Sequence, residues 1–242
     1  MELAGRVALV TGAGRRLGQA IAIGLARAGC DLAVHYHASR EGAEATLQAV
    51  RATGRRAEAV GADLRDPAAA RALPDRVVAV LGRLDVLVNS AAVMLRREFE
   101  AITPPEWNDA LALNLTAAFF TAQGAAPHLR KTHGKIINLA DVAAFEVWRA
   151  YLPLSVSKAG IVMLTRSLAG VLAPEVTVNA VAPGAVLPPD EWPVEARTCL
   201  AETTPLQRLG TPDDVVHAVL FLLENDYITG VVLPVDGGRL LR

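Results

Sequence analysis

The sequence predicts a single-domain α/β fold, a doubly wound parallel sheet of seven strands with helices on both faces. Short runs rich in β-branched residues alternate with longer amphipathic stretches along the whole chain, which is typical of βαβ units. The chain has 242 residues, 52% hydrophobic and 20% charged, which is enough to bury a sheet on both faces. No low-complexity linker or internal repeat divides it, so residues 1–242 are expected to form one domain.

The elements follow in alternating order. We expect strands at residues 6–11, 31–36, 57–60, 84–89, 135–139, 176–181 and 231–235. We expect helices near residues 17–28, 40–53, 67–80, 105–129, 155–172 and 212–223. The one long irregular stretch, 184–210, is rich in proline, and it predicts a substrate lid around 185–210.

Composition excludes several classes of function. The formal charge of −1 leaves no electrostatic footprint for nucleic acid or anionic lipid, so a small molecule is the expected ligand. The N-terminus lacks the features of a signal peptide, and the apolar run at 215–223 is shorter than the roughly 20 residues that cross a bilayer. We therefore expect a cytoplasmic protein without a membrane segment. Cys30 and Cys199 lack redox spacing and predict reduced structural thiols, and the five histidines form no metal-ligand pattern.

A glycine-rich turn follows the first expected strand and leads into a helix: Thr11-Gly12-Ala13-Gly14-Arg15-Arg16-Leu17-Gly18. Glycines let a backbone approach a pyrophosphate closely, and the free N–H groups at the start of a helix bind the anion. The position of the turn predicts a dinucleotide site of the Rossmann type; the alternative is a plain strand-to-helix turn.

The spacing of this turn resembles T-G-x-x-x-G-x-G of the short-chain dehydrogenase/reductase family, with Arg16 in place of the middle glycine. An arginine there, and the segment His35 to Arg40, are similar to the pteridine reductases of that family. NAD-preferring Rossmann sites carry an acid at the end of the second strand, where this chain has Tyr36 and His37. Arg15, Arg16, Ser39 and Arg40 offer donors to a 2′-phosphate instead, so NADP(H) is the expected cofactor.

Further segments resemble the family in the same order. Gly61-Ala62-Asp63-Leu64 is similar to the segment that flanks the adenine, and Asn89-Ser90-Ala91-Ala92 to the family's N-N-A-G segment. Pro183-Gly184 is similar to the turn beside the nicotinamide carboxamide. The cofactor-binding residues that the resemblance implies are Gly12, Gly14, Arg15, Arg16, Leu17, Gly18, Tyr36, His37, Ser39, Arg40, Asp63, Leu64, Asn89, Ala91, Lys158, Pro183 and Gly184.

The catalytic tetrad of the family is Asn, Ser, Tyr and Lys, the last two as Y-x-x-x-K. Asn114 and Lys158 match it, so the serine position is Asp141, as in the pteridine reductases, and the tyrosine position is Leu154. In the family the tyrosine hydroxyl passes a proton to the substrate, which leucine cannot do. Tyr151, three residues earlier, is a possible substitute donor.

Two functions therefore stay open. The first is an NADP(H)-dependent reductase for a small carbonyl or pterin-like substrate, slow or atypical because of Leu154. The second is a non-catalytic NADP(H)-binding sensor or inactive oligomer partner. The aromatic residue that stacks on pterins is replaced by Val93-Met94, and Trp148 or Trp192 is expected either to line the pocket instead or to pack. The resemblance also implies a homotetramer, with interfaces at the helices of Asn114 and Lys158 and at strand 231–235.

Overall fold

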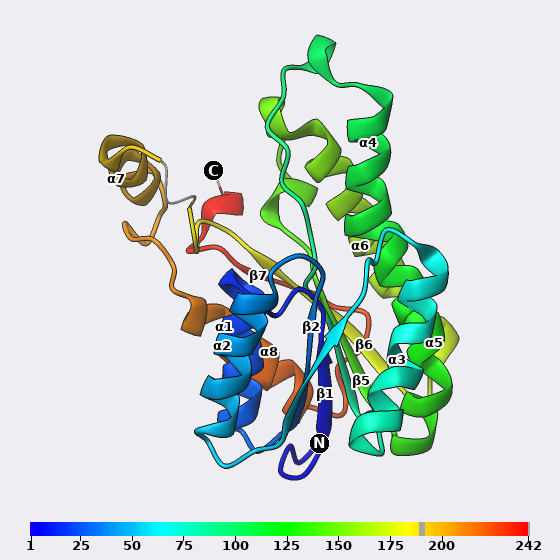
Figure 1. Ribbon diagram of the computed structural model, residues 1–242. Coiled ribbons are helices and arrows are strands. Elements are labelled where there is room, and N and C mark those ends of the chain that lie inside the picture. The colour runs from blue at the N-terminus through cyan, green and yellow to red at the C-terminus, as the bar shows by residue number, and fades with distance from the viewer. Residues whose placement is uncertain (189–191, 242) are drawn as a thin grey trace.

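The computed structural model describes residues 1–188 and 192–241, which form one sheet of seven parallel strands in the order β3-β2-β1-β4-β5-β6-β7 (Figure 1). The strands are β1 Val7–Val10, β2 Asp31–Tyr36, β3 Ala57–Gly61, β4 Val86–Asn89, β5 Lys135–Leu139, β6 Thr177–Pro183 and β7 Val232–Val235. The predicted fold class is confirmed, and the expected strands are found within one or two residues at each end.

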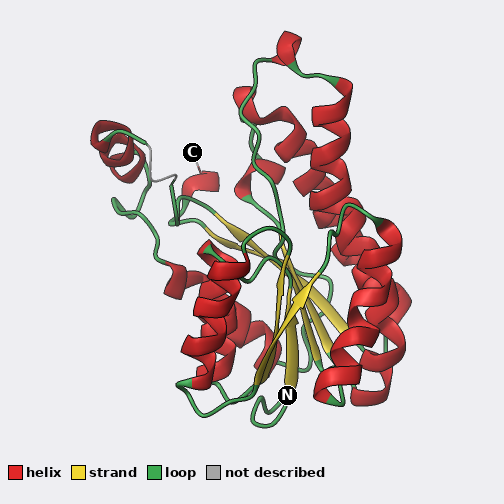
Figure 2. Cartoon of the chain, viewed as in Figure 1, coloured by secondary structure: helices red, strands yellow, loops and turns green. Residues whose placement is uncertain are grey.

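Helices cover both faces of the sheet (Figure 2). One face carries α1 (Arg16–Arg27), α2 (Arg40–Arg51) and α8 (Pro212–Glu224), and the other carries α3 (Pro67–Leu81), α5 (Ala117–Thr132) and α6 (Leu152–Leu172). Strand β1 explains why both faces are covered. Its side chains alternate between two hydrophobic cores, with Ala8 and Val10 in one and Val7 and Leu9 in the other.

The helix expected at 105–129 is three consecutive elements. Helix α4 (Pro104–Leu111) begins with a capping box between Thr103 and Glu106, and a π-helical turn, Ala112–Thr116, joins it to α5. A π-turn inserts one extra residue into the helical repeat, and such turns are frequent at functional sites. Asn114 lies in the middle of this turn, where the sequence pattern alone shows only continuous helix.

The stretch expected to be irregular contains a helix, α7 (Val194–Glu202), which buries none of its residues and stands off from the sheet (Figure 1). Of the expected lid at 185–210, residues 189–191 lie outside the described part of the chain. The amphipathic signal of α7 is weak because both of its faces are partly exposed, which is why the sequence pattern missed it.

Within the described residues, one helical stretch, Arg149–Leu172, is long and apolar enough to cross a membrane by length and composition. It is longer than the apolar run noted at 215–223. The stretch packs against β6 and carries the buried side chain of Lys158. A helix in the core of an α/β domain has this composition because it faces the sheet.

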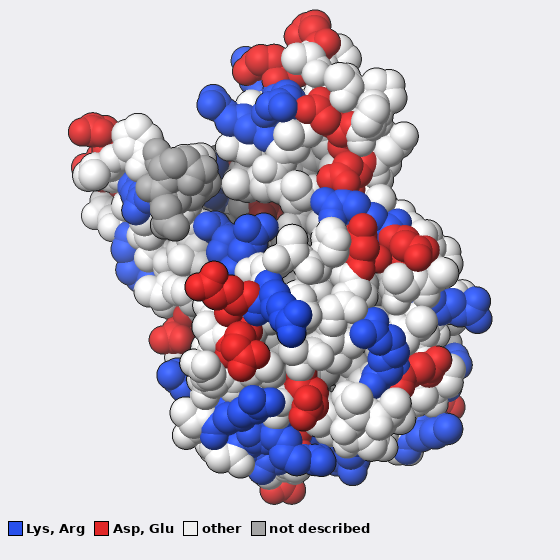
Figure 3. Space-filling view, in the orientation of Figure 1, with Lys and Arg blue, Asp and Glu red and all other residues white. Residues whose placement is uncertain are grey.

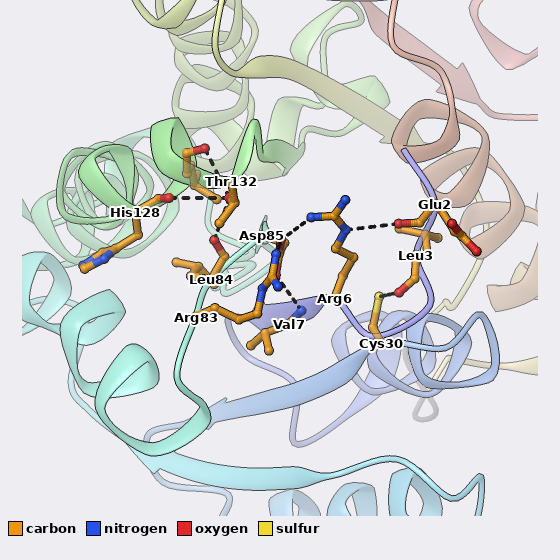
Figure 4. Close-up of polar contacts among 11 residues, drawn as sticks. Glu2, Leu3, Arg6, Val7, Cys30, Arg83, Leu84, Asp85, His128 and Thr132 are labelled. Atoms are coloured by element: carbon orange, nitrogen blue, oxygen red, sulfur yellow. Dashed lines mark hydrogen bonds and ion pairs between the residues drawn. The ribbon is translucent and has the colours of Figure 1, made fainter.

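At the edge of the sheet where the strands begin, side chains form a network of hydrogen bonds around Asp85 (Figure 4). The buried carboxylate of Asp85 accepts hydrogen bonds from the Val7 main-chain N–H (3.0 Å), Arg6 Nη1 (2.9 Å) and Arg83 Nε (2.7 Å). Cys30 lies nearby, and burial raises the pKa of its thiol to about 12, so it is the unreactive structural thiol that the sequence predicts. Cys199 differs, because it is exposed on α7.

Candidate functional site

The carboxyl ends of the strands meet loops where the strand order reverses, between β1 and β4, which is where open α/β sheets bind ligands. The surface is hollowed on this side, between the part that carries α7 and the part that carries α4 (Figure 3). The residues predicted for the cofactor and for the tetrad lie in or just after strands β1 to β6, in helices α1, α2 and α6, and in the turns before α5 and α6, and they converge on this edge.

The glycine-rich turn has the geometry that a dinucleotide site needs. Gly12 has a φ of +66° and lies so close to β4 that an added Cβ would meet Ala91 Cα at 2.9 Å. A Cβ on Gly18 would meet the Gly12 oxygen at 2.4 Å. Helix α1 has no side-chain cap and no acidic residue in its first turn, so its N–H groups are left for an anion. These residues fit the pyrophosphate of a dinucleotide.

Arg16 lies in this turn in the left-handed conformation, with a φ of +52°, which is the backbone conformation that favours glycine. Its Nη2 donates a hydrogen bond to the main-chain oxygen of Leu187, at the start of the expected lid. The expected group of four 2′-phosphate donors is therefore divided, because Arg16 is engaged with the loop after β6. Leu17, next to it, is partly buried against the core.

The predicted adenosine side lies at the start of α2 and the ends of β2 and β3. Arg15 and Arg40 are exposed, and Ser39 is the N-cap of α2 without using its hydroxyl as a cap. Gly14 packs against this segment, since its Cβ would meet the Ser39 oxygen at 3.0 Å. The free N-terminus of α2 and the two arginines can receive a phosphate.

An acid does reach this region, contrary to the expectation from strand β2 alone. The carboxylate of Asp63, which follows β3, lies 3.8 Å from His37 Nε2, and Arg65 lies 3.7 Å from the same carboxylate. Leu64 is buried beneath it, and the Tyr36 ring packs against Gly61. The sequence could not show this pairing because it depends on the register of β2 against β3.

His35 is a site residue that the sequence reasoning missed. Its Nδ1 accepts a hydrogen bond from the Gly12 N–H (3.0 Å), and its Nε2 lies 3.1 Å from the Ala62 oxygen. Burial lowers the pKa of His35 to about 4, so the ring is neutral and carries its proton on Nε2. The ring joins the glycine turn to the loop after β3. Its place at a buried strand position next to a glycine turn was the available signal.

A small pocket lies beside the glycine turn at the ends of β4 and β5. Its polar lining comes from Thr11, Asn89, Asn114 and Lys158. Thr11 Oγ1 accepts hydrogen bonds from the Ser90 and Ala91 N–H groups at 2.9 and 3.0 Å. Asn89 is held by Asn138, whose Oδ1 accepts from Asn89 Nδ2 at 2.9 Å. Each predicted residue of this segment is thus fixed at the pocket.

Asn114 is held by both ends of its amide. Oδ1 accepts from the Val93 N–H at 2.8 Å, while Nδ2 donates to the Val93 oxygen and to Ser157 Oγ at 3.0 and 3.1 Å. Ser157 in turn donates to the Leu154 oxygen at 2.8 Å. The side chain therefore ties the π-turn to α6, and Leu113 and Asn114 of that turn line the pocket.

Lys158 is buried, and the half-buried Asp141 lies near it. Lys158 Nζ donates to the Leu139 oxygen at 2.5 Å, and burial lowers the pKa of its ammonium to about 8, opposed by the charge of Asp141. Burial raises the pKa of Asp141, while a hydrogen bond from the Ala143 N–H (2.8 Å) and the charge of Lys158 act in the opposite direction. A lysine and a carboxyl are thus held where their proton affinities approach each other.

Leu154 lies one turn before Lys158 on α6 and is 3% exposed. Tyr151 is in the 3₁₀ turn Arg149–Tyr151, just before α6, and its ring packs edge-on against Trp148 with centroids 5.8 Å apart. Its hydroxyl makes no hydrogen bond to any described residue. Trp148 packs within this group, and Trp192 is partly buried.

Pro183 ends β6, and Gly184 follows it in close contact with the end of β7. The Gly184 N–H donates to the Val235 oxygen at 3.0 Å, and a Cβ on Gly184 would meet Asp236 Cα at 2.8 Å. Among the described residues, no three His, Cys, Asp or Glu side chains gather as ligands for a metal.

The chain is similar to known proteins over nearly its whole length. Residues 12–239 match the family model described as Enoyl-(Acyl carrier protein) reductase. The chain is 36% identical over its whole length to 98% of the 2-dehydro-3-deoxy-D-gluconate 5-dehydrogenase of Escherichia coli K12. It is 37% identical, over 96% of each chain, to the 3-oxoacyl-[acyl-carrier-protein] reductase FabG of Staphylococcus aureus Mu50.

Solved structures are similar over almost the whole chain. A protein from Sinorhizobium meliloti 1021, provisionally named a short-chain alcohol dehydrogenase, has a TM-score of 0.94 and 35% identity, covering 99% of this chain and 98% of that one. A protein from Agrobacterium tumefaciens, provisionally named a gluconate dehydrogenase, has a TM-score of 0.91 and 32% identity, covering 99% and 97%.

Proposed function

The chain belongs to the short-chain dehydrogenase/reductase family of nicotinamide-dependent oxidoreductases, and on that premise we propose that it uses NADP(H) to reduce a small carbonyl or pterin-like substrate. In such a reduction the substrate carbon gains two electrons and a hydrogen, and its oxygen or nitrogen gains a proton. The bound cofactor supplies the electron pair and the hydrogen. The protein has to supply the proton and the orientation of the two reactants.

One observation carries the proposal: Asn114 and Lys158 line a pocket that adjoins the glycine turn, and Asp141 lies near enough to Lys158 for the charge of each to shift the pKa of the other. The free N–H groups of α1 and the residues Arg15, Ser39 and Arg40 would hold the phosphates, and Lys158 would hold the nicotinamide ribose. The proposed preference for NADP(H) over NAD(H) rests on Arg15 and Arg40, at the amino-terminal ends of α1 and α2. The negative charge of Asp63 opposes binding of a 2′-phosphate, but Arg65 beside it compensates that charge.

The proton donor that we assign is Asp141. Its Oδ1 is engaged by the Ala143 N–H, while its Oδ2 makes no hydrogen bond within the described residues and is available to hold a proton. Burial raises its pKa, so the protonated form persists to higher pH than in an ordinary carboxyl. Lys158 lies close enough to influence that pKa and can return the proton after each turnover.

The second function is a non-catalytic NADP(H)-binding protein, and the buried Leu154 favours it. Positioned acids contribute roughly 10²–10⁴ in rate, so replacing the tyrosine by an aliphatic side chain removes most of the usual proton transfer. Everything needed for cofactor binding is retained in this case as well.

A screen for NADPH oxidation over pterins, quinones and small ketones, run beside a cofactor titration, separates the two functions. We expect binding and slow turnover. Binding without turnover of any substrate supports the second function, and a chain that binds neither NADPH nor NADH contradicts both. Because relatives carry sugar-acid and acyl-carrier-protein substrates in their names, the screen includes 2-keto and 3-keto acids.

We also propose a cytoplasmic homotetramer. Exposed apolar side chains support the two expected interfaces: Val156, Met163 and Val171 on α6, Phe119 on α5, and Phe221 and Val231 near β7. Light scattering at micromolar concentration measures the assembly, and a monomer contradicts it.

A further inference from the structure

The last turn of the chain is bound to the loop that follows β5. Glu146 lies five residues after Asp141, and its Oε1 accepts two hydrogen bonds, from Trp148 Nε1 at 2.5 Å and from Arg239 Nε at 2.7 Å. Arg239 is 93 residues away in the sequence and belongs to the 3₁₀ turn Arg239–Leu241, η5. Figure 1 shows this C-terminal turn on the same edge of the sheet as α7 and the loops of the site.

The backbone before Arg239 is built to place it there. Gly237 and Gly238 have φ values of +65° and +88°, which reverse the chain after β7. The carboxylate of Asp236 closes the turn by accepting from the Gly238 and Leu240 N–H groups, both at 2.9 Å. The Arg239 side chain is consequently only 16% exposed although it lies close to the C-terminus.

The guanidinium of Arg239 is held on two sides and keeps donors to spare. Its carbon lies 5.4 Å from the centroid of the Trp148 ring, and its Nε is bonded to Glu146. Nη1 and Nη2 make no hydrogen bond to the described residues, and neither is among the buried unpaired polar atoms, so both are open to solvent. A guanidinium has five N–H donors, and a planar pair of them matches a carboxylate.

The charges around Asp141 favour an anion beside Arg239. The carboxyl of Asp141 interacts electrostatically with the charges of Lys158 on α6, Glu146 in its own loop and Arg239 in the C-terminal turn. When Asp141 carries the proton that it donates, two cations and one anion remain. An anionic substrate restores the balance of charge in a place where burial makes imbalance costly.

We propose that Arg239 is a specificity-determining residue that binds a carboxylate of the substrate through Nη1 and Nη2, with Glu146 and Trp148 as its positioning residues. The inference rests on the proposed function in one respect, because it assumes that the substrate lies between Arg239 and Asp141. The site is then expected to bind small, hydrophilic carboxylic acids more tightly than neutral carbonyl compounds of the same size.

The test measures binding and does not depend on turnover. Gluconate and its uncharged counterpart glucitol are titrated into the full-length protein with saturating NADP⁺, and the fluorescence of Trp148 is followed. We expect gluconate to bind and glucitol to bind at least about 10-fold more weakly, since a hydrogen-bonded charge pair distinguishes them. Trp148→Phe identifies the signal, and calorimetry then checks that the variant still binds gluconate.

Three variants assign the effect to Arg239. Arg239→Gln is expected to lower the affinity for gluconate about 10- to 100-fold without changing the affinity for NADP⁺. Arg239→Lys is expected to lose only part of the affinity for gluconate, because the charge stays but the paired donors are lost. Glu146→Gln keeps an acceptor oxygen but removes a competing negative charge, so gluconate should bind several-fold more tightly. Arg130→Gln, at an exposed site on α5, is the matched control.

Equal affinity for gluconate in the wild type and Arg239→Gln overturns the inference, as does a wild type that binds gluconate no better than glucitol. If Arg239→Gln does not fold, as judged by its thermal unfolding, Arg239→Lys decides the question alone. Absence of NADPH turnover with every substrate counts against the reductase and leaves this binding test readable.

Discussion

The main-chain N–H of Gly12 donates a 3.0 Å hydrogen bond to Nδ1 of His35, so the glycine turn is held by a ring that must stay neutral. The other ring nitrogen faces the Ala62 oxygen at 3.1 Å. If the ring took up a second proton, Nδ1 would become a donor facing the Gly12 N–H. The glycine turn would then lose its connection to β2.

Stability should therefore fall in mild acid. The unfolded chain protonates His35 near pH 6.5 but the native chain only at about 4, so the stabilisation is complete above pH 6.5 and is lost as the pH falls toward 4. This difference in the pKa of His35 between the unfolded and native chains corresponds to about 3 kcal/mol of unfolding free energy. Urea unfolding between pH 4.5 and 7 measures it. His35→Gln should flatten the dependence over this range, and His128→Gln, at an ion pair near the surface, should not.

Cofactor preference should depend on Arg15 and Arg40. Arg15→Gln and Arg40→Gln are each expected to lower the affinity for NADP⁺ about 10-fold and to leave the affinity for NAD⁺ unchanged, because only NADP⁺ carries the 2′-phosphate. Arg16→Gly should change both affinities by the same factor, since Arg16 contacts Leu187. Calorimetry with both cofactors measures this, with Arg27→Gln at the end of α1 as the control. Wild-type affinities that are equal for the two cofactors contradict the assignment.

Leu154→Tyr should raise the rate of NADPH oxidation by about 10² or more, because it places a phenol one helical turn from Lys158. Leu154→Phe is the matched control, since it adds the ring without the hydroxyl. Both variants should lose about 1–3 kcal/mol of stability through overpacking at this buried position. A wild-type rate as high as that of Leu154→Tyr means that the donor lies elsewhere, and Tyr151→Phe then tests the neighbouring hydroxyl.

The rate of the wild type should fall as the pH rises. The donor proton of Asp141 is present below its raised pKa and is lost above it, and the Lys158 ammonium is lost as the pH passes about 8. Asp141→Asn should lower kcat by roughly 10²–10⁴ and leave NADPH binding intact. Stopped-flow rates from pH 5.5 to 9 measure the profile. A rate in Asp141→Asn equal to that of Asp213→Asn, an exposed control, removes Asp141 from the proton path.

The sequence by itself determined the fold class, the strands and the glycine turn, because each depends on local patterns. The alternation of Val7, Ala8, Leu9 and Val10 between two cores is a periodicity of two that is visible in the sequence. The positions of Asp141, Leu154 and Lys158 follow from spacing along one loop and one helix. That Leu154 stands four residues before Lys158 can therefore be read from the sequence alone.

Only the tertiary structure decided which residues meet across the sheet. The pairing of His37 with Asp63 depends on the register of β2 and β3. The hydrogen bond from Arg16 to Leu187 depends on the path of the loop after β6. The contact of Arg239 with Glu146 depends on the reversal of the chain at two glycines. Each joins segments that are far apart in the sequence. Local propensity and periodicity carry no information about such contacts, since they arise when separate elements pack at the same edge of the sheet.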